Sequence, residues 1–161
     1  MDERSADSTD PDEIPAESVL TERVGLFVEH TEPELLYRIE TAADRVVNTW
    51  PGTSVTDPSA VREPFVDAID DLDVRPMACT LIGSVTDRFG LEAVASPVPA
   101  PPYVVVTTGK IVLRTTIADG RLVMELAAFE IRTRPSRIYE RRESVAVSAR
   151  IVDRTADHDR S

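Results

Sequence analysis

Apolar residues recur at helical spacing through the first half of this chain and at strand spacing through its last third. Up to about residue 90, large apolar side chains return every three or four positions, which is the period of an amphipathic helix. Between residues 103 and 152, β-branched residues form short runs or alternate with polar ones, as in strands. The pattern therefore predicts helices first and a sheet afterwards.

Four helices are predicted in the first half, at residues 16–30, 31–50, 59–72 and 76–89. Thr31, Pro33 and Glu34 predict a capping box at the start of the second helix. Pro64 is a candidate break in the third helix, because proline cannot donate the backbone hydrogen bond of a helix interior. Gly90 is expected to stop the fourth helix.

Four strands are predicted after a connection with four prolines at residues 96–102, and they cover residues 103–108, 111–117, 121–132 and 137–152. Gly109-Lys110 and Asp119-Gly120 predict the first two turns, and Pro135-Ser136 predicts the third. An interruption near Arg142 is one option for the long last strand.

This order predicts an α+β fold in which about four N-terminal helices pack on one face of a C-terminal four-stranded antiparallel meander. We expect a single domain over residues 16–152, with a helical part at 16–90, the proline-rich connection at 96–102 and a sheet part at 103–152. Residues 1–15 and 153–161 are polar and acidic, and we expect disordered tails there.

The charged residues are unusual, because 17 arginines accompany a single lysine, Lys110, in a chain with 29 Asp and Glu and a net charge of -11. Carboxylates hold water and cations, whereas lysine adds a long apolar stem that concentrated salt drives out of solution. This composition indicates a protein of an extreme halophile, most simply a haloarchaeon.

The same composition predicts a cytoplasmic protein with no membrane partner. No apolar run reaches the roughly 18 residues of a membrane span, and the acidic N-terminus is unlike a signal peptide. Cys79 is the sole cysteine, so no internal disulfide can form.

Basic residues gather in the sheet part: residues 1–102 carry a net charge of -14, whereas residues 103–154 carry +4. The densest group, which we call the arginine cluster, surrounds the turn before the last strand and comprises Arg132, Arg134, Arg137, Tyr139, Arg141 and Arg142. Guanidinium groups bind carboxylates and phosphates through paired hydrogen bonds, and Tyr139 could stack on a base, so the cluster is a candidate anion or nucleic-acid site.

The alternative for the arginine cluster is pairing with Glu130, Glu140 and Glu143 or docking of the acidic helices. Molar salt screens charges within about 3 Å, so a purely electrostatic phosphate site would fail in such a cell. We therefore favour structural or protein contacts over an anion or nucleic-acid site.

Candidate catalytic and metal-binding residues are sparse. Cys79 has no histidine near it in the sequence and is expected in the core. His30 ends a predicted helix, where a positive charge is favoured. The cluster of Asp67, Asp70, Asp71 and Asp73 is expected to form a solvated helix face. Isolated glycines make no phosphate loop. We therefore predict no catalytic residue, metal or cofactor.

Several segments resemble a small family of uncharacterised haloarchaeal proteins. They are Ala100-Pro-Pro-Tyr-Val-Val-Val-Thr-Thr108, Val112-Leu-Arg-Thr-Thr116, Asp119-Gly-Arg-Leu-Val123 and Phe129-Glu-Ile131. The resemblance runs from about residue 17 to residue 152. It implies a halophilic protein with helices before a Pro-Pro-Tyr strand and an Asp-Gly hairpin, and it implies no activity.

The leading hypothesis is a non-enzymatic cytoplasmic accessory or interaction module that binds a protein partner or another copy of itself. The first alternative is a binder of a small anionic ligand or nucleic acid through an arginine-rich sheet face. The second is an enzyme that uses carboxylates and Tyr139, which a deep polar pocket would support.

Overall fold

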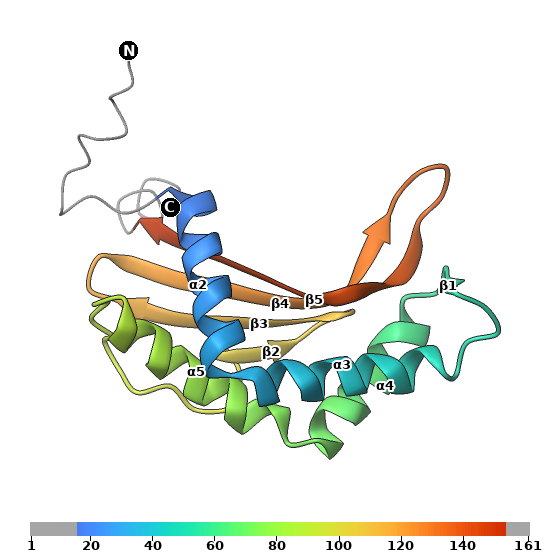
Figure 1. Cartoon of the computed structure of the whole chain (residues 1–161), viewed down its shortest axis with the longest axis horizontal. Helices are drawn as coiled ribbons and strands as arrows, with labels where there is room; N and C mark the ends of the chain where they lie inside the picture. The colour runs from blue at the N-terminus through green and yellow to red at the C-terminus, as the bar shows by residue number, and fades with distance from the viewer. Residues whose placement is uncertain (1–15, 154–161) are drawn as a thin grey trace, which may run out of the picture.

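The computed structural model describes residues 16–153, in which helices precede most of an antiparallel sheet. The elements are α2 (Glu17–Thr31), α3 (Pro33–Val47), β1 (Ser54–Val55), α4 (Ser59–Asp71), α5 (Val74–Arg88), β2 (Val104–Val106), β3 (Lys110–Ile117), β4 (Gly120–Arg132) and β5 (Ile138–Asp153). Figure 1 shows the helices gathered on one side of the sheet and along its edge. The predicted α+β order is confirmed.

The sheet has five strands rather than the predicted four, in the order β1-β5-β4-β3-β2, and every neighbouring pair is antiparallel. The additional strand, β1, comes from the segment between α3 and α4. Ser54 and Val55 pair with Glu140 and Tyr139 of β5. Two residues are too few to show a period along the sequence, so this strand was not predicted.

The predicted tails are only partly within the described residues. Residues 1–15 and 154–161 lie outside them. Asp153, which we expected in the C-terminal tail, is the last residue of β5 and pairs with Gly120.

The core lies between the helices and the facing side of β3 and β4. Large, fully buried side chains come from both layers, including Leu35, Ile39, Phe65, Leu81, Ile111, Leu113, Met124 and Leu126. At one end of the core, the Phe129 ring contacts both Trp50 and Phe65, with ring centroids 5.7 and 5.8 Å apart. Helix α4 is thereby joined to the sheet through an aromatic cluster.

The chain between α2 and α3 differs from the predicted capping box. Thr31 is the last residue of α2, and Glu32, with φ -128° and ψ 52°, separates the two helices without a side-chain cap. Proline disfavours the helical conformation in the residue before it, so Pro33 forces Glu32 out of the helix. One non-helical residue is therefore enough to turn the chain.

Pro64 does not break α4, which is continuous from Ser59 to Asp71. A proline leaves the carbonyl four residues earlier without its helical hydrogen bond. Here that carbonyl belongs to Ala60, and it accepts a hydrogen bond from the Trp50 indole at 3.2 Å. The Trp50 side chain, three residues after the end of α3, thus gives the Ala60 carbonyl a hydrogen-bond partner. Helix α4 therefore continues through Pro64.

The start of α4 is fixed by Asp57. One carboxylate oxygen accepts hydrogen bonds from the Ser59 backbone N–H at 3.0 Å and from the Ser59 hydroxyl at 2.9 Å. These two bonds, the backbone one first, lower the pKa of Asp57, and nearby Arg62 adds to the effect. The helix begins at Ser59, as predicted from the sequence.

The links on either side of α5 use left-handed backbone conformations. Asp73 joins α4 to α5 at φ 56°, which a short polar side chain tolerates better than most. Gly90 follows α5 at φ 68°, where the Leu91 N–H bonds to the Thr86 carbonyl at 2.8 Å. Gly90 therefore ends the helix in a Schellman motif, as the sequence predicts.

The ladder between β4 and β5 is interrupted close to the expected position. Ala127 pairs with Ala146, but Phe129 pairs with Arg141, so one residue of β4 faces four of β5. The backbone N–H groups of Ala128 and Phe129 instead bond to the Gly109 carbonyl at 2.9 and 3.2 Å. Beyond this irregularity β4 and β5 form an arm that leaves the rest of the sheet, beside β1 (Figure 1).

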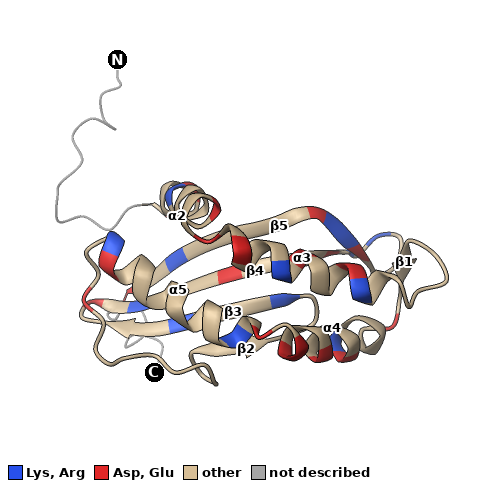
Figure 2. Ribbon diagram, turned by 60° about the horizontal axis from the view of Figure 1, so that its bottom comes forward, with Lys and Arg blue, Asp and Glu red and all other residues tan. Residues whose placement is uncertain are grey.

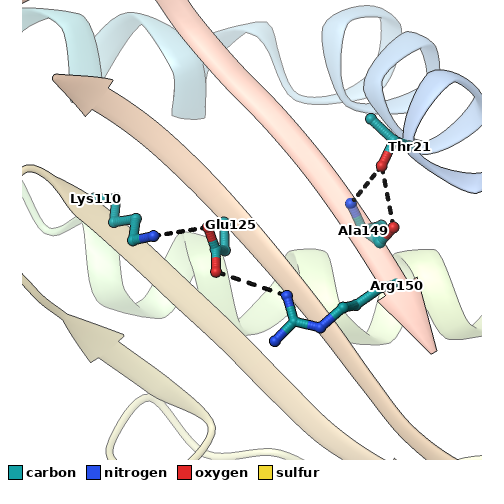
Figure 3. Close-up of polar contacts among 5 residues, drawn as sticks. All are labelled: Thr21, Lys110, Glu125, Ala149 and Arg150. Carbon is teal, nitrogen blue, oxygen red and sulfur yellow. Dashed lines mark hydrogen bonds and ion pairs between the residues drawn. The ribbon is translucent and has the colours of Figure 1, made fainter. Parts of the chain in front are cut away.

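Helix α2 packs against β5 beyond β1 and bonds to its edge at Ala149. The Thr21 hydroxyl donates to the Ala149 carbonyl and accepts from the Ala149 N–H, both at 3.0 Å (Figure 3). A single side chain therefore satisfies both backbone groups that Ala149 would otherwise expose at the edge.

Candidate binding face of the sheet

The central strands alternate between a face covered by helices and a face on which no helix of the described part of the chain packs. We call the second surface the open face. It comprises Lys110, Val112, Arg114 and Thr116 of β3, Arg121, Val123, Glu125 and Ala127 of β4, and Ala146, Ser148, Arg150 and Val152 of β5. The period of two residues places these side chains opposite the core residues.

The two layers differ in charge. The helical part, residues 16–90, has 14 acidic and 6 basic residues, whereas residues 103–153 have 9 basic and 6 acidic residues. Figure 2 shows acidic residues gathered on α4 and basic residues along the strands behind the helices. The open face itself carries four basic side chains and one carboxylate, so it is positive in an acidic protein.

Glu125 lies at the centre of the open face. Its carboxylate is 2.9 Å from Lys110 Nζ and 3.8 Å from an Arg150 guanidinium nitrogen (Figure 3). The three residues come from β4, β3 and β5 in turn, so the pair of contacts joins three strands. Arg114, on the same face of β3, is exposed and forms no ion pair with a described residue.

A shallow hollow of about 210 Å³ lies at the β2 end of the open face. Arg114 and Arg121 line it together with Tyr103 and Thr116. Thr116 and Arg121 are direct cross-strand partners, which places the hydroxyl and the guanidinium on the same surface. None of the lining residues is a carboxylate, so the hollow could receive an acidic group.

Three residues of the arginine cluster are engaged by carboxylates. Arg132 pairs with Glu140 at 3.0 Å, and Arg142 lies 3.6 Å from Glu130. These pairs cross between the two strands of the arm. Arg141 points the other way, to the helices, and pairs with Asp44 of α3.

The other members of the arginine cluster are separated from these. Tyr139 is 3% exposed and packs in the core, so its ring does not line a surface. Arg134 and Arg137 are exposed at the tip of the arm and form no ion pair with a described residue. The arm therefore does not bring all six side chains to one place, and binding by its arginines stays a prediction.

The other candidate residues, Cys79 and the aspartates of α4, make contacts that belong to the fold rather than to a site. Cys79 is half-buried against the core, and burial raises the pKa of its thiol. Asp70 and Asp71 form ion pairs with Arg75 and Arg45, each at 2.7 Å. Within residues 16–153, no three His, Cys, Asp or Glu side chains come together in a way that could hold a metal ion.

None of the described helices is long and apolar enough to cross a membrane.

The open face is not evident from the sequence, because its basic residues are not neighbours along the chain. Lys110, Arg114, Glu125 and Arg150 are spread over forty positions. A period of two places Arg114, Glu125 and Arg150 on the polar sides of their predicted strands, whereas Lys110 falls in a predicted turn. Their order across the sheet, however, depends on the register of strand pairing.

Comparison with protein families gives one match, a domain of unknown function (DUF7988) that covers residues 22–152. The chain belongs to this family. The matched part of this DUF7988 chain contains the open face, the arm and nearly all of the helical layer, in agreement with the resemblance to an uncharacterised family. Neither the curated proteins nor the solved structures gave a match.

Proposed function

We propose that this DUF7988 protein is a non-enzymatic interaction module that docks an acidic protein surface on its open face. The observation that carries the proposal is the concentration of basic side chains on the one sheet face that the described helices leave uncovered. The protein partner would supply the layer that such a face lacks.

The shape of the open face favours contact with a protein. Ala127, Ala146 and Ser148 occupy the middle of β4 and β5, so another chain can approach the backbone closely. Long basic side chains surround these small ones. The small residues beside the charged centre therefore leave room for the side chains of a partner.

A nucleic-acid partner is less favoured on this face. Glu125 would repel a phosphate backbone, and it already engages Lys110 and Arg150. A second copy that used the same face would bring two positive surfaces together. Charge complementarity instead points to a partner with an acidic surface.

The proposal includes an extreme halophile as the source and the cytoplasm as the location. Both rest on the single lysine, the 17 arginines and the 29 carboxylates. Repulsion among carboxylates destabilises a folded protein at low ionic strength. We therefore expect the melting temperature to rise from dilute buffer to molar KCl, as measured by circular dichroism. An unchanged melting temperature would contradict the halophilic origin.

Site-specific photo-crosslinking in the native host tests the interaction. A crosslinking amino acid at Ala127 reports on the open face, and one at Tyr37, which is 64% exposed on α3, is the matched control. We expect Ala127 to capture one discrete acidic protein that the control does not capture.

The purified partner should then bind the wild-type protein and lose affinity for the Arg114→Glu, Arg150→Glu double variant. Arg62→Glu on α4 is the control for charge reversal away from the face. Equal capture from both crosslinking positions, or unchanged binding by the double variant, would rule the proposal out.

A second candidate function, binding of a small anion or nucleic acid, is favoured by Arg134 and Arg137, which are exposed at the tip of the arm and pair with no carboxylate of residues 16–153. Filter binding of oligonucleotides in molar KCl tests it. Saturable binding that disappears in the Arg134→Ala, Arg137→Ala variant would support the arm as a site, and the absence of binding would exclude it.

A further inference from the structure

A second candidate site lies on the helical side, between the C-terminal ends of α2 and α5. An open pocket of about 740 Å³ is found there, within the range of roughly 300–1,000 Å³ that is usual for small-molecule sites. Its lining residues are Arg23, Leu26, Phe27, His30, Thr31, Arg88 and Phe89. The open face and the arginine cluster contribute nothing to it.

One side of the pocket is a face of α2. Arg23, Leu26, Phe27 and His30 follow the helical spacing of three and four residues, so their side chains share this face. Leu26 is 61% exposed, the highest value among the described apolar residues of α2. Burial of Leu26 by a ligand would remove apolar surface from water, which favours binding.

The floor of the pocket is aromatic. Phe27 and Phe89 meet edge to face with their ring centroids 6.0 Å apart. The Arg88 guanidinium carbon lies 5.6 Å from the centroid of the Phe89 ring, so this cation rests over the floor. An apolar group that enters the pocket would lie against the rings with a positive charge beside it.

The charged groups of the pocket are all basic. Arg23 and Arg88 form no ion pair with a described residue, although the chain has 29 carboxylates. His30 and Arg88 lie in the last turns of their helices, where a positive charge also interacts with the helix dipole. Arg23 lies two turns before the end of α2, so the dipole does not account for it.

We infer that this pocket binds a small carboxylate with an apolar tail. The tail packs on Leu26, Phe27 and Phe89, and the carboxylate meets the guanidinium groups of Arg23 and Arg88. The apolar contacts do not weaken in concentrated salt, in contrast to a site of exposed charges alone. This binding activity is independent of the protein docking proposed for the open face.

Octanoate is a suitable probe, and octyltrimethylammonium, which has the same tail with a positive head, is its counterpart. Titrations of the full chain in molar KCl are followed by isothermal calorimetry and by amide shifts in NMR spectra. We expect saturable binding of octanoate, with the largest shifts at the ends of α2 and α5. Octyltrimethylammonium should bind at least tenfold more weakly.

Two variants locate the site without disturbing the core. Leu26→Asp places a carboxylate at the exposed rim and should weaken octanoate binding at least tenfold. Val19→Asp, at another exposed apolar position of α2, is the matched control and should bind as the wild type does. Arg23→Gln should weaken binding about tenfold, as expected for the loss of a charge-assisted hydrogen bond.

The inference is overturned if octanoate does not saturate or if both probes bind equally. It is also overturned if Leu26→Asp retains wild-type affinity while its circular dichroism spectrum is unchanged. None of these variants lies on the open face. Absence of octanoate binding would therefore leave the docking proposal intact, and absence of a partner on the open face would leave the pocket proposal intact.

Discussion

The two faces of the sheet are built from the same strands but are occupied by different side chains. On the helix-covered face, Leu113, Met124 and Leu126 are large, apolar and essentially inaccessible to water. On the open face, charged residues alternate with Val112 and Val123, which are 5% and 4% exposed. Burial alone therefore does not distinguish the faces.

What distinguishes them is how the burial is achieved. The register places Val123 opposite both Arg114 of β3 and Arg150 of β5. Long basic side chains can cover a neighbour with their apolar stems while the charged ends stay in water. One face is closed by a packed layer of helices, and the other by side chains that a partner could displace.

The largest expected effect on the free energy of unfolding comes from shortening one buried side chain on each face. Leu126→Ala should lower the free energy of unfolding by about 2–5 kcal/mol, because it leaves a cavity beneath the helices. Val123→Ala on the open face should cost about 1.5 kcal/mol, since flexible side chains can close over the gap. Urea denaturation of both variants measures the difference. Equal losses would mean that the open face is packed as rigidly as the core.

The next effect concerns the partly buried hydrogen bond between Trp50 and the Ala60 carbonyl on the covered side. Trp50→Phe removes the indole donor to the Ala60 carbonyl and should cost about 1–3 kcal/mol. In a Pro64→Ala background, the new backbone N–H can bond to the same carbonyl, so Trp50→Phe should cost less there. A double-mutant cycle from denaturation curves measures this coupling. Additive losses would show that Trp50 does not compensate for Pro64.

A smaller effect is expected for the central carboxylate of the open face. Glu125→Gln removes the charge shared by Lys110 and Arg150 and should lower stability by about 1 kcal/mol in dilute buffer. Molar KCl should reduce this loss, because salt screens half-exposed pairs. The unfolding free energies of both proteins over a KCl series check this. A loss that does not change with salt would contradict the ion-pair explanation.

The smallest effect is the pH dependence at Asp57, which is remote from both faces. Its pKa is lowered in the folded protein, so its stabilising contribution is present above the unfolded value of about 4 and is lost as pH falls through the folded pKa. We expect Asp57→Ala to destabilise the protein at neutral pH and to become equivalent to the wild type in acid. Thermal melts between neutral pH and about pH 3 measure the convergence, with Asp57→Asn, which keeps an accepting oxygen, as the control.

The sequence predicted the elements better than their ends and contacts. Helical spacing and Gly90 located the four helices, because local patterns and local caps were sufficient. Ser54–Val55 was missed because its strand character comes only from pairing with β5. Thr31 was misassigned because the effect of Pro33 on Glu32 outweighed a plausible capping sequence.

The sequence located the basic binding region only as a part of the chain, without the contacts of its residues. Counting charges located the basic third of the chain, but the partner of Arg141 is Asp44, 97 positions away. Equally, the pocket of α2 and α5 depends on two helix ends that the sequence separates by more than fifty residues. Local spacing cannot reveal contacts that tertiary packing creates.

The contact between Thr21 and Ala149 also has a consequence for the order of events in synthesis. The two residues are 128 positions apart, so α2 emerges from the ribosome long before the strand edge that it seals. Contacts that close so long a loop slow folding, because the chain must lose much of its freedom first. The first described helix of this protein can reach its final position only after the last strand has been made.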